Sequence, residues 1–157
     1  MEQRYSNIYK NARVTAGLTQ ERWAEMIGVS PDSIRKYEGG SCIPSDDVVA
    51  RMAEISGMTV LGYWHLKQKS SVANDLLPDV ELVPLPQAVV QLLSELNDLE
   101  EKKIVPELLS IARDGEIDRE EQPYFDKILL ELDDVVRAAL AVKYSQWKGG
   151  ADEHGGT

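Results

Sequence analysis

Cysteine is almost missing from this chain, and histidine is scarce. The 157 residues contain one cysteine, Cys42, and two histidines, His65 and His154. A single cysteine excludes an internal disulfide and fits a reducing compartment, so we expect a cytoplasmic protein. Because so few nitrogen and sulfur ligands stand so far apart in the sequence, we expect no zinc or other metal site and no cofactor.

Long apolar runs are missing as well. No stretch approaches the roughly 18 consecutive apolar residues that a membrane-spanning helix needs. The first residues, Met-Glu-Gln-Arg-Tyr-Ser, lack the apolar core of a signal peptide. We therefore expect no association with a membrane. The composition, with 43% hydrophobic and 28% charged residues, is typical of a folded globular protein.

Basic residues are outnumbered by acidic residues in only one half of the chain. The whole sequence has a formal net charge of −10. Residues 1–69 hold nine basic and eight acidic residues, a balance of +1, whereas residues 70–157 hold eight and nineteen, a balance of −11. A nearly neutral part is therefore joined to a strongly acidic part, which indicates two parts with different tasks.

The first 69 residues have the pattern of five short helices. Apolar spacing and helix-ending glycines predict these helices at residues 8–16, 20–27, 31–38, 45 to about 56, and from 59 or 60 to about 69. Thr19, Ser30 and Ser45 can each cap a helix N-terminus, and Pro31 suits the first position of the third helix because no N–H is needed there. Since no alternating strand pattern occurs, residues 1–69 are predicted to form a compact all-α domain.

A linker and a helical hairpin are predicted to follow. Serine, asparagine and proline break the apolar spacing over residues 70–86, which predicts a linker. Helical spacing returns at Gln87, restarts near Ile104 ahead of Pro106, and ends in a long helix from about 119 to 146. The sequence thus predicts an acidic antiparallel hairpin over residues 87–148.

The predicted hairpin carries an apolar stripe too wide for a single partner helix. Two helices alone make a thin core, so we expect a homodimer through residues 87–146. The glycine-rich end of the chain, residues 149–157, is expected to be disordered.

No catalytic arrangement is visible, and we do not expect an enzyme. The many carboxylates of the second half lack a paired histidine, a nucleophile or a glycine-rich phosphate loop. The stretch "SIARDGEIDREE" imitates the end of a calcium-binding loop, but Ser110 and Ala112 stand where calcium needs carboxylates. A structural interpretation accounts for the same residues, with Gly115 ending one helix and Asp118 and Glu121 forming a capping box for the next.

The second and third predicted helices meet the steric requirements of a helix-turn-helix unit. The helices must cross closely, which requires a small residue in the first of them, and Ala24 stands there. The turn between them needs a residue that accepts a positive φ, and Gly28 does so. A branched apolar residue must anchor the second helix, and Ile34 has that position.

Residues 8–66 resemble the phage-repressor, Cro and Xre class of DNA-binding domains. The matching strings are Arg13-x-x-x-Gly17-Leu18-Thr19-Gln20-Glu21, Ala24-x-x-Ile27-Gly28-Val29-Ser30, Ile34-x-x-Tyr37-Glu38-x-Gly40 and Pro44-Ser45. The resemblance implies a five-helix fold like that of the lambda repressor. It also implies that an arginine of the first helix, here Arg13, pairs with a glutamate at the end of the recognition helix, here Glu38.

The resemblance further implies which residues contact DNA. Residues 31–38 become the recognition helix, whose groove-facing positions are Pro31, Asp32, Ser33 and Lys36, with Arg35 beside them. Lys36 can donate to guanine and Asp32 can accept from cytosine, although the two can instead form an ion pair with each other along the helix. The remaining candidates are phosphate contacts, namely Gln20, Arg22, Arg35 and Ser41.

Two functions are consistent with these features. The first is a sequence-specific transcriptional regulator that binds double-stranded DNA as a dimer, a repressor of the phage or mobile-element type. A dimer is expected because a domain with a balance of +1 gains little from phosphate attraction, and because the loop after the recognition helix, residues 39–43, carries no charge. The alternative is an antitoxin-like or adaptor protein whose acidic half binds a protein partner.

Overall fold

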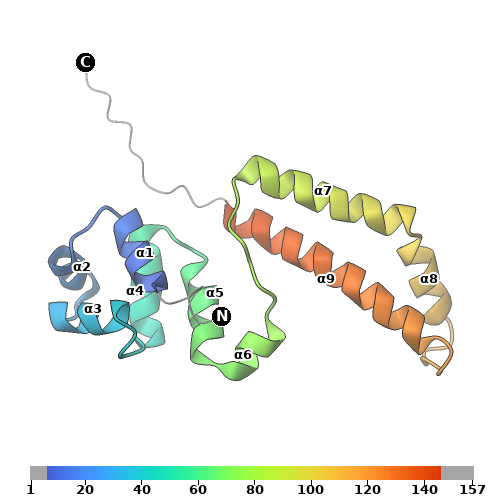
Figure 1. The fold of residues 1–157 in the computed structure, drawn as a ribbon, viewed down its shortest axis with the longest axis horizontal. Helices are drawn as coiled ribbons and strands as arrows, with labels where there is room; N and C mark the ends of the chain where they lie inside the picture. The colour runs from blue at the N-terminus through green and yellow to red at the C-terminus, as the bar shows by residue number, and fades with distance from the viewer. Residues whose placement is uncertain (1–6, 146–157) are drawn as a thin grey trace, which may run out of the picture. The chain divides into compact units, whose positions relative to one another are not determined.

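Helices make up all the regular structure of the residues that the computed structural model describes, 7–145 (Figure 1). The chain divides into two compact units, whose described parts are residues 7–77 and 78–145. The prediction of an all-α fold is confirmed. The expected tail at 149–157, and the last residues of the predicted hairpin, lie outside the described residues. Within 7–145 no helix is long and apolar enough to cross a membrane.

The first unit contains the five predicted helices and a sixth. They are α1 (Ile8–Thr15), α2 (Gln20–Ile27), α3 (Pro31–Glu38), α4 (Asp46–Ser56), α5 (Leu61–Lys69) and α6 (Ser71–Leu76). Each predicted boundary agrees with the structure to within two residues. The core of this unit is shared by α1, α2, α3, α4 and α5, through the buried side chains of Ile8, Trp23, Ile34, Met52 and Leu61.

Helix α6 lies inside the stretch that the sequence predicted to be a linker, residues 70–86. Ser70 acts as an N-cap, because its hydroxyl accepts a hydrogen bond from the Ala73 N–H at 3.2 Å. The buried ammonium of Lys67 donates to the carbonyl oxygens of Asn74 and Leu77 at the end of α6. Lys67 thereby fastens α6 to α5, and the first unit ends at Leu77 rather than at residue 69.

The second unit is a hairpin closed by a short helix. Its helices are α7 (Leu85–Glu101), α8 (Ile104–Ile111) and α9 (Gln122–Ser145). Helices α7 and α9 pack side by side in antiparallel directions, and α8 joins them at one end (Figure 1). At that end Ile104, Ile111 and Ile128 form a buried cluster. Nearer the other end Ala88 and Ala141 are buried, and their small side chains allow α7 and α9 to approach closely. The predicted hairpin is present.

The breaks between these three helices lie near the predicted places. The chain turns at Lys103, whose φ of 55° ends α7, and α8 restarts at Ile104 as predicted. Pro106 occupies the first turn of α8, where its missing N–H costs no hydrogen bond. Asp118 and Glu121 form the predicted capping box, since each side chain accepts from the other's N–H, at 2.8 and 3.2 Å. Helix α9 itself begins at residue 122 rather than 119, after a turn.

Candidate nucleic-acid interface

Helices α2 and α3 meet through a tight glycine turn. Gly28 has a φ of 81°, and its N–H donates to the Ala24 carbonyl at 2.9 Å. The methyl of Ala24 is buried where α2 and α3 pack together, and Ile34 of α3 is completely buried. These are the three positions that the sequence singled out, and each has the predicted environment.

Both ends of α3 are held by hydrogen bonds. At its start, the Ser30 hydroxyl accepts from the Ser33 N–H at 3.1 Å, and Pro31 fills the first helical position. At its end, Gly40 adopts a φ of 75°, which lets the Ser41 N–H donate to the Lys36 carbonyl at 3.0 Å. Helix α3 is thus capped at each end, and its outer side chains are carried on a rigid segment.

A buried ion pair ties α3 to α1. The Arg13 guanidinium donates to both carboxylate oxygens of Glu38, from Nε at 2.6 Å and from the terminal nitrogen at 3.1 Å. A third donor, the Gln20 amide, lies 2.8 Å from the same carboxylate. Burial opposes ionisation of Glu38, but the hydrogen bonds from Arg13 and Gln20 together keep its pKa below the usual value. The same contact raises the pKa of Arg13. Glu38 is therefore ionised and held by all three helices, α1, α2 and α3.

The sequence predicted Gln20 only as a phosphate contact. Its hydrogen bond to Glu38 was not predicted. Its amide nitrogen carries two hydrogens, and one of them is committed to Glu38. The second hydrogen takes no part in this contact. Glu38 thus orients the Gln20 amide, and no pattern in the sequence indicates this, because the two residues are 18 positions apart.

The outer face of α3 consists of Asp32, Arg35 and Lys36. All three side chains are more than half exposed. The Lys36 ammonium lies 2.8 Å from one Asp32 oxygen, and the Arg35 guanidinium lies 4.0 Å from the other. The hydrogen bond between Lys36 and Asp32 lowers the pKa of the Asp32 carboxyl and raises the pKa of the Lys36 ammonium. Both groups are therefore charged at neutral pH, and the ammonium of Lys36, with three hydrogens, can donate to another acceptor beside Asp32 or in its place.

The other predicted contact residues lie around this face with partners of their own. Arg22, on the exposed surface of α2, pairs with Glu25 at 2.6 Å. The hydroxyl of the half-buried Ser33 lies 2.8 Å from the hydroxyl of Ser30, so these two hydroxyls form a hydrogen bond at the start of α3. The Ser41 hydroxyl donates to the Lys36 carbonyl at 3.3 Å, so Ser41 lies next to the C-terminal end of the outer face. The structure therefore groups Asp32, Arg35, Lys36 and Ser41, with Arg22 on a separate helix.

Comparison with known proteins agrees with this geometry. Residues 10–60 match the family model described as a helix-turn-helix domain. The chain carries a helix-turn-helix domain. The matched range begins inside α1 and ends before α5, so it contains the glycine turn and the whole of α3. No curated protein gave a significant match. No solved structure did so either.

The first unit contains a second, partly buried polar network that the sequence did not reveal. The Tyr9 hydroxyl lies 2.8 Å from Nδ1 of His65, and Nε2 of the same ring lies 3.0 Å from an Asp46 oxygen. Lys69 also donates to that oxygen, at 2.6 Å. Together Lys69 and His65 lower the pKa of Asp46. The network joins α1, the start of α4 and α5, and so fixes the scaffold beneath the α2–α3 pair.

Tyr9 makes the stability of this domain sensitive to alkaline pH. Burial raises the pKa of its phenol from 10 to about 12. The phenol thus stabilises the fold fully below pH 10, and this contribution is lost as the pH rises from 10 towards 12, at about 1.4 kcal/mol per pH unit. Tyr9→Phe has no such group, so its free energy of unfolding should converge on that of the wild type over this range. Urea unfolding at several pH values measures this.

The exposed Tyr124, which lies in the other unit, serves as the control. Tyr124→Phe should follow the wild type at every pH. A difference between the wild type and Tyr9→Phe that stays constant between pH 10 and 12 would contradict the assignment.

Proposed function

We propose that this protein is a sequence-specific DNA-binding transcriptional regulator that works as a dimer, a repressor of the phage-repressor, Cro and Xre type. The observation that carries the proposal is the outer face of α3, which presents Asp32, Arg35 and Lys36 on a capped, rigid helix of a helix-turn-helix domain. In such units this helix enters the major groove, where side chains read base edges. A protein with this ligand acts where DNA is found, and we expect it in the cytoplasm.

The proposed contacts divide into base readers and phosphate binders. Lys36 is suited to donate to the O6 or N7 of guanine, and Asp32 is suited to accept from the N4 of cytosine. Their ion pair is exposed to solvent, so exchanging it for base contacts requires little reorganisation. Gln20 retains a free amide hydrogen near the N-terminus of α2, where phosphates bind well. Arg22, Arg35 and Ser41 are the further candidates for backbone contacts.

Charge supports a dimer rather than a monomer. Residues 1–69 have a balance of only +1, so attraction to phosphates contributes little affinity for one copy. Two copies held together bring two recognition helices to half-sites about 34–36 Å apart, and the second binding event becomes intramolecular. The acidic second unit, with a balance of −9 over residues 78–145, weakens binding to DNA that lacks the site.

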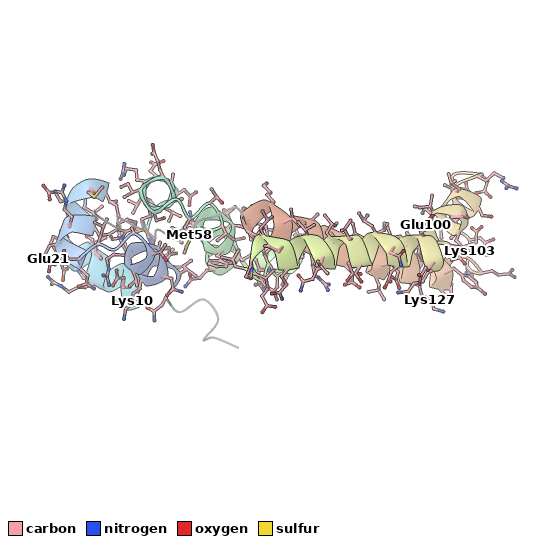
Figure 2. The ribbon with its side chains drawn as sticks, turned by 90° about the horizontal axis from the view of Figure 1, so that it is seen from above. Lys10, Glu21, Met58, Glu100, Lys103 and Lys127 are labelled. Atoms are coloured by element: carbon pink, nitrogen blue, oxygen red, sulfur yellow. The ribbon has the colours of Figure 1, made fainter. Side chains whose placement is uncertain are left out.

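Removal of the Lys36 side chain is the direct test. Titrating labelled duplex from the protein's own promoter should show tighter binding than a scrambled duplex of the same length. Lys36→Ala should weaken promoter binding by about 1–3 kcal/mol, between roughly 5-fold and 150-fold, and leave binding to the scrambled duplex nearly unchanged. Lys127→Ala removes the same charge from an exposed position on α9 and should change neither affinity (Figure 2). Equal affinity of the wild type for all sequences would refute the proposal.

The acidic second unit supports one other candidate function, that of an antitoxin-like or adaptor protein. Sixteen acidic and seven basic residues lie in residues 78–145, and a basic protein partner would be attracted to that surface. The neighbouring gene discriminates between the two candidates. A gene for a small basic toxin favours the antitoxin, whereas a divergent promoter with inverted repeats favours the regulator.

A further inference from the structure

Six large apolar side chains of the second unit form an exposed stripe along α7 and α9. They are between 38% and 60% exposed, and we call them the hairpin face: Leu85, Val89, Leu93, Leu96, Leu129 and Val136. On α7 they recur at steps of four, four and three residues, which places them on one side of the helix. An exposed apolar patch of this kind is often an interaction site.

The two halves of the hairpin face lie on the same side of the second unit. Along α7, Val89 follows the buried Ala88 by one residue, and Leu93 follows the half-buried Leu92 in the same way. Along α9, Leu129 follows the buried Ile128 by one residue. One residue turns a helix by about 100° in a fixed sense. Because α7 and α9 run in opposite directions (Figure 1), equal turns bring both stripes to one side.

Charge is absent from most of the α7 half of the hairpin face. The first ten residues of α7, 85–94, contain no charged residue. Three charges border the face: Glu100 in the last turn of α7, Lys143 in the last turn of α9, and the exposed Asp133, which lies between Leu129 and Val136 on α9. Glu100 and Lys143 stand at opposite ends of the face. Figure 2 shows Glu100 at the α8 end of the unit, near Lys103. A partner that presents an apolar face with the charges of Glu100 and Lys143 in reverse order would therefore complement both ends of it.

A second copy of the chain presents such a face. When the second copy is turned end for end, its hairpin face lies against the hairpin face of the first copy. Its Lys143 end then lies beside the Glu100 end of the first copy. A Leu or Val side chain offers on the order of 100 Å² of apolar surface, so two half-exposed faces would bury on the order of 600 Å². The smallest specific interfaces bury about 1,000 Å² in total, and about 65% of a homodimer interface is apolar. The estimated 600 Å² of apolar surface is therefore about the apolar part of a small homodimer interface.

We propose that the hairpin face binds the hairpin face of a second copy, in antiparallel orientation, and forms a four-helix bundle with two-fold symmetry. The proposal deepens the dimeric function given above by naming the surface that joins the two copies. Each hairpin contributes α7 and α9, which together complete a core that one hairpin lacks.

Light scattering on the full chain at several concentrations tests the proposal. The wild type should have twice the 17.5 kDa mass of one chain. Leu93→Glu and Val136→Glu place a carboxylate in the interface, and each should raise the dissociation constant at least about 30-fold. Val90→Glu and Leu130→Glu are matched controls, because Val90 and Leu130 are equally apolar and exposed, at 67% and 64%, but point away from the face. Both controls should remain dimeric.

A charge exchange tests the orientation. Lys143→Glu should weaken the dimer, and adding Glu100→Lys should restore it. A monomeric wild type, controls that dissociate as readily as Leu93→Glu, or an exchange that fails to restore the dimer would each overturn the proposal. These results are separate from DNA binding: a dimer that Leu93→Glu disrupts, in a protein with no preference among DNA sequences, would support the hairpin face while refuting the proposed function.

Discussion

Replacing Arg13 by methionine is expected to lower the free energy of unfolding of the helix-turn-helix domain by about 3–5 kcal/mol, the largest effect of any substitution considered. The side chains of Arg13 and Glu38 are only 13% and 6% exposed. Removing the guanidinium takes two hydrogen bonds and the paired positive charge away from the Glu38 carboxylate, and breaking a buried ion pair by removing one partner is costly. Urea unfolding at neutral pH, followed by circular dichroism, measures the loss.

A double substitution separates the lost ion pair from lost packing. Arg13→Met combined with Glu38→Leu removes both charges and keeps apolar volume, so much of the lost stability should return. The pH dependence gives a second check. The pKa of Glu38 is lowered in the folded state, so its stabilising contribution is present at neutral pH and is lost as the pH falls through the folded-state pKa. The single variant should therefore differ less from the wild type in acid, and an equal deficit at both pH values would contradict this account.

Shortening Ile34 to alanine is expected to cost about 3 kcal/mol of stability. Ile34 is completely buried and holds α3 against the core of its unit. The cavity left behind lies directly under the outer face of α3, so Asp32 and Lys36 lose the rigid support that the proposed base contacts require. The variant should thus bind promoter DNA more weakly than its fraction of folded protein explains.

Val14→Ala is the matched control for Ile34→Ala. Val14 lies on α1 and is 59% exposed, so its truncation should change the stability by less than about 0.5 kcal/mol. If Ile34→Ala costs no more than Val14→Ala, then Ile34 is not the anchor that the sequence pattern indicates.

The features that sequence reasoning predicted correctly depend on neighbours along the chain. The positive φ of Gly28, the Ser30 cap and the Asp118–Glu121 capping box each involve residues a few positions apart, and side-chain chemistry decides them locally. The i,i+4 pair of Asp32 and Lys36 could be anticipated for the same reason. The Arg13–Glu38 pair was accessible only through the family resemblance.

The features that were missed depend on tertiary packing. Tyr9 and His65 are 56 residues apart, and nothing in the spacing of either indicates the other. The fastening of α6 by Lys67 was missed because Ser70 and Ser71 were interpreted as helix breakers, whereas Ser70 is a cap. The hairpin face was only partly foreseen, because a wide apolar stripe in the sequence does not tell which side chains α7 and α9 bury against each other.

Selection of binding sites from a pool of random duplex DNA tests the central claim most directly, namely that the outer face of α3 reads bases. The wild type should enrich one two-fold symmetric sequence, and Lys36→Ala should enrich the same sequence with preference lost at one position in each half. Recovery of no enriched sequence by the wild type, or of an identical one by Lys36→Ala, would contradict that claim.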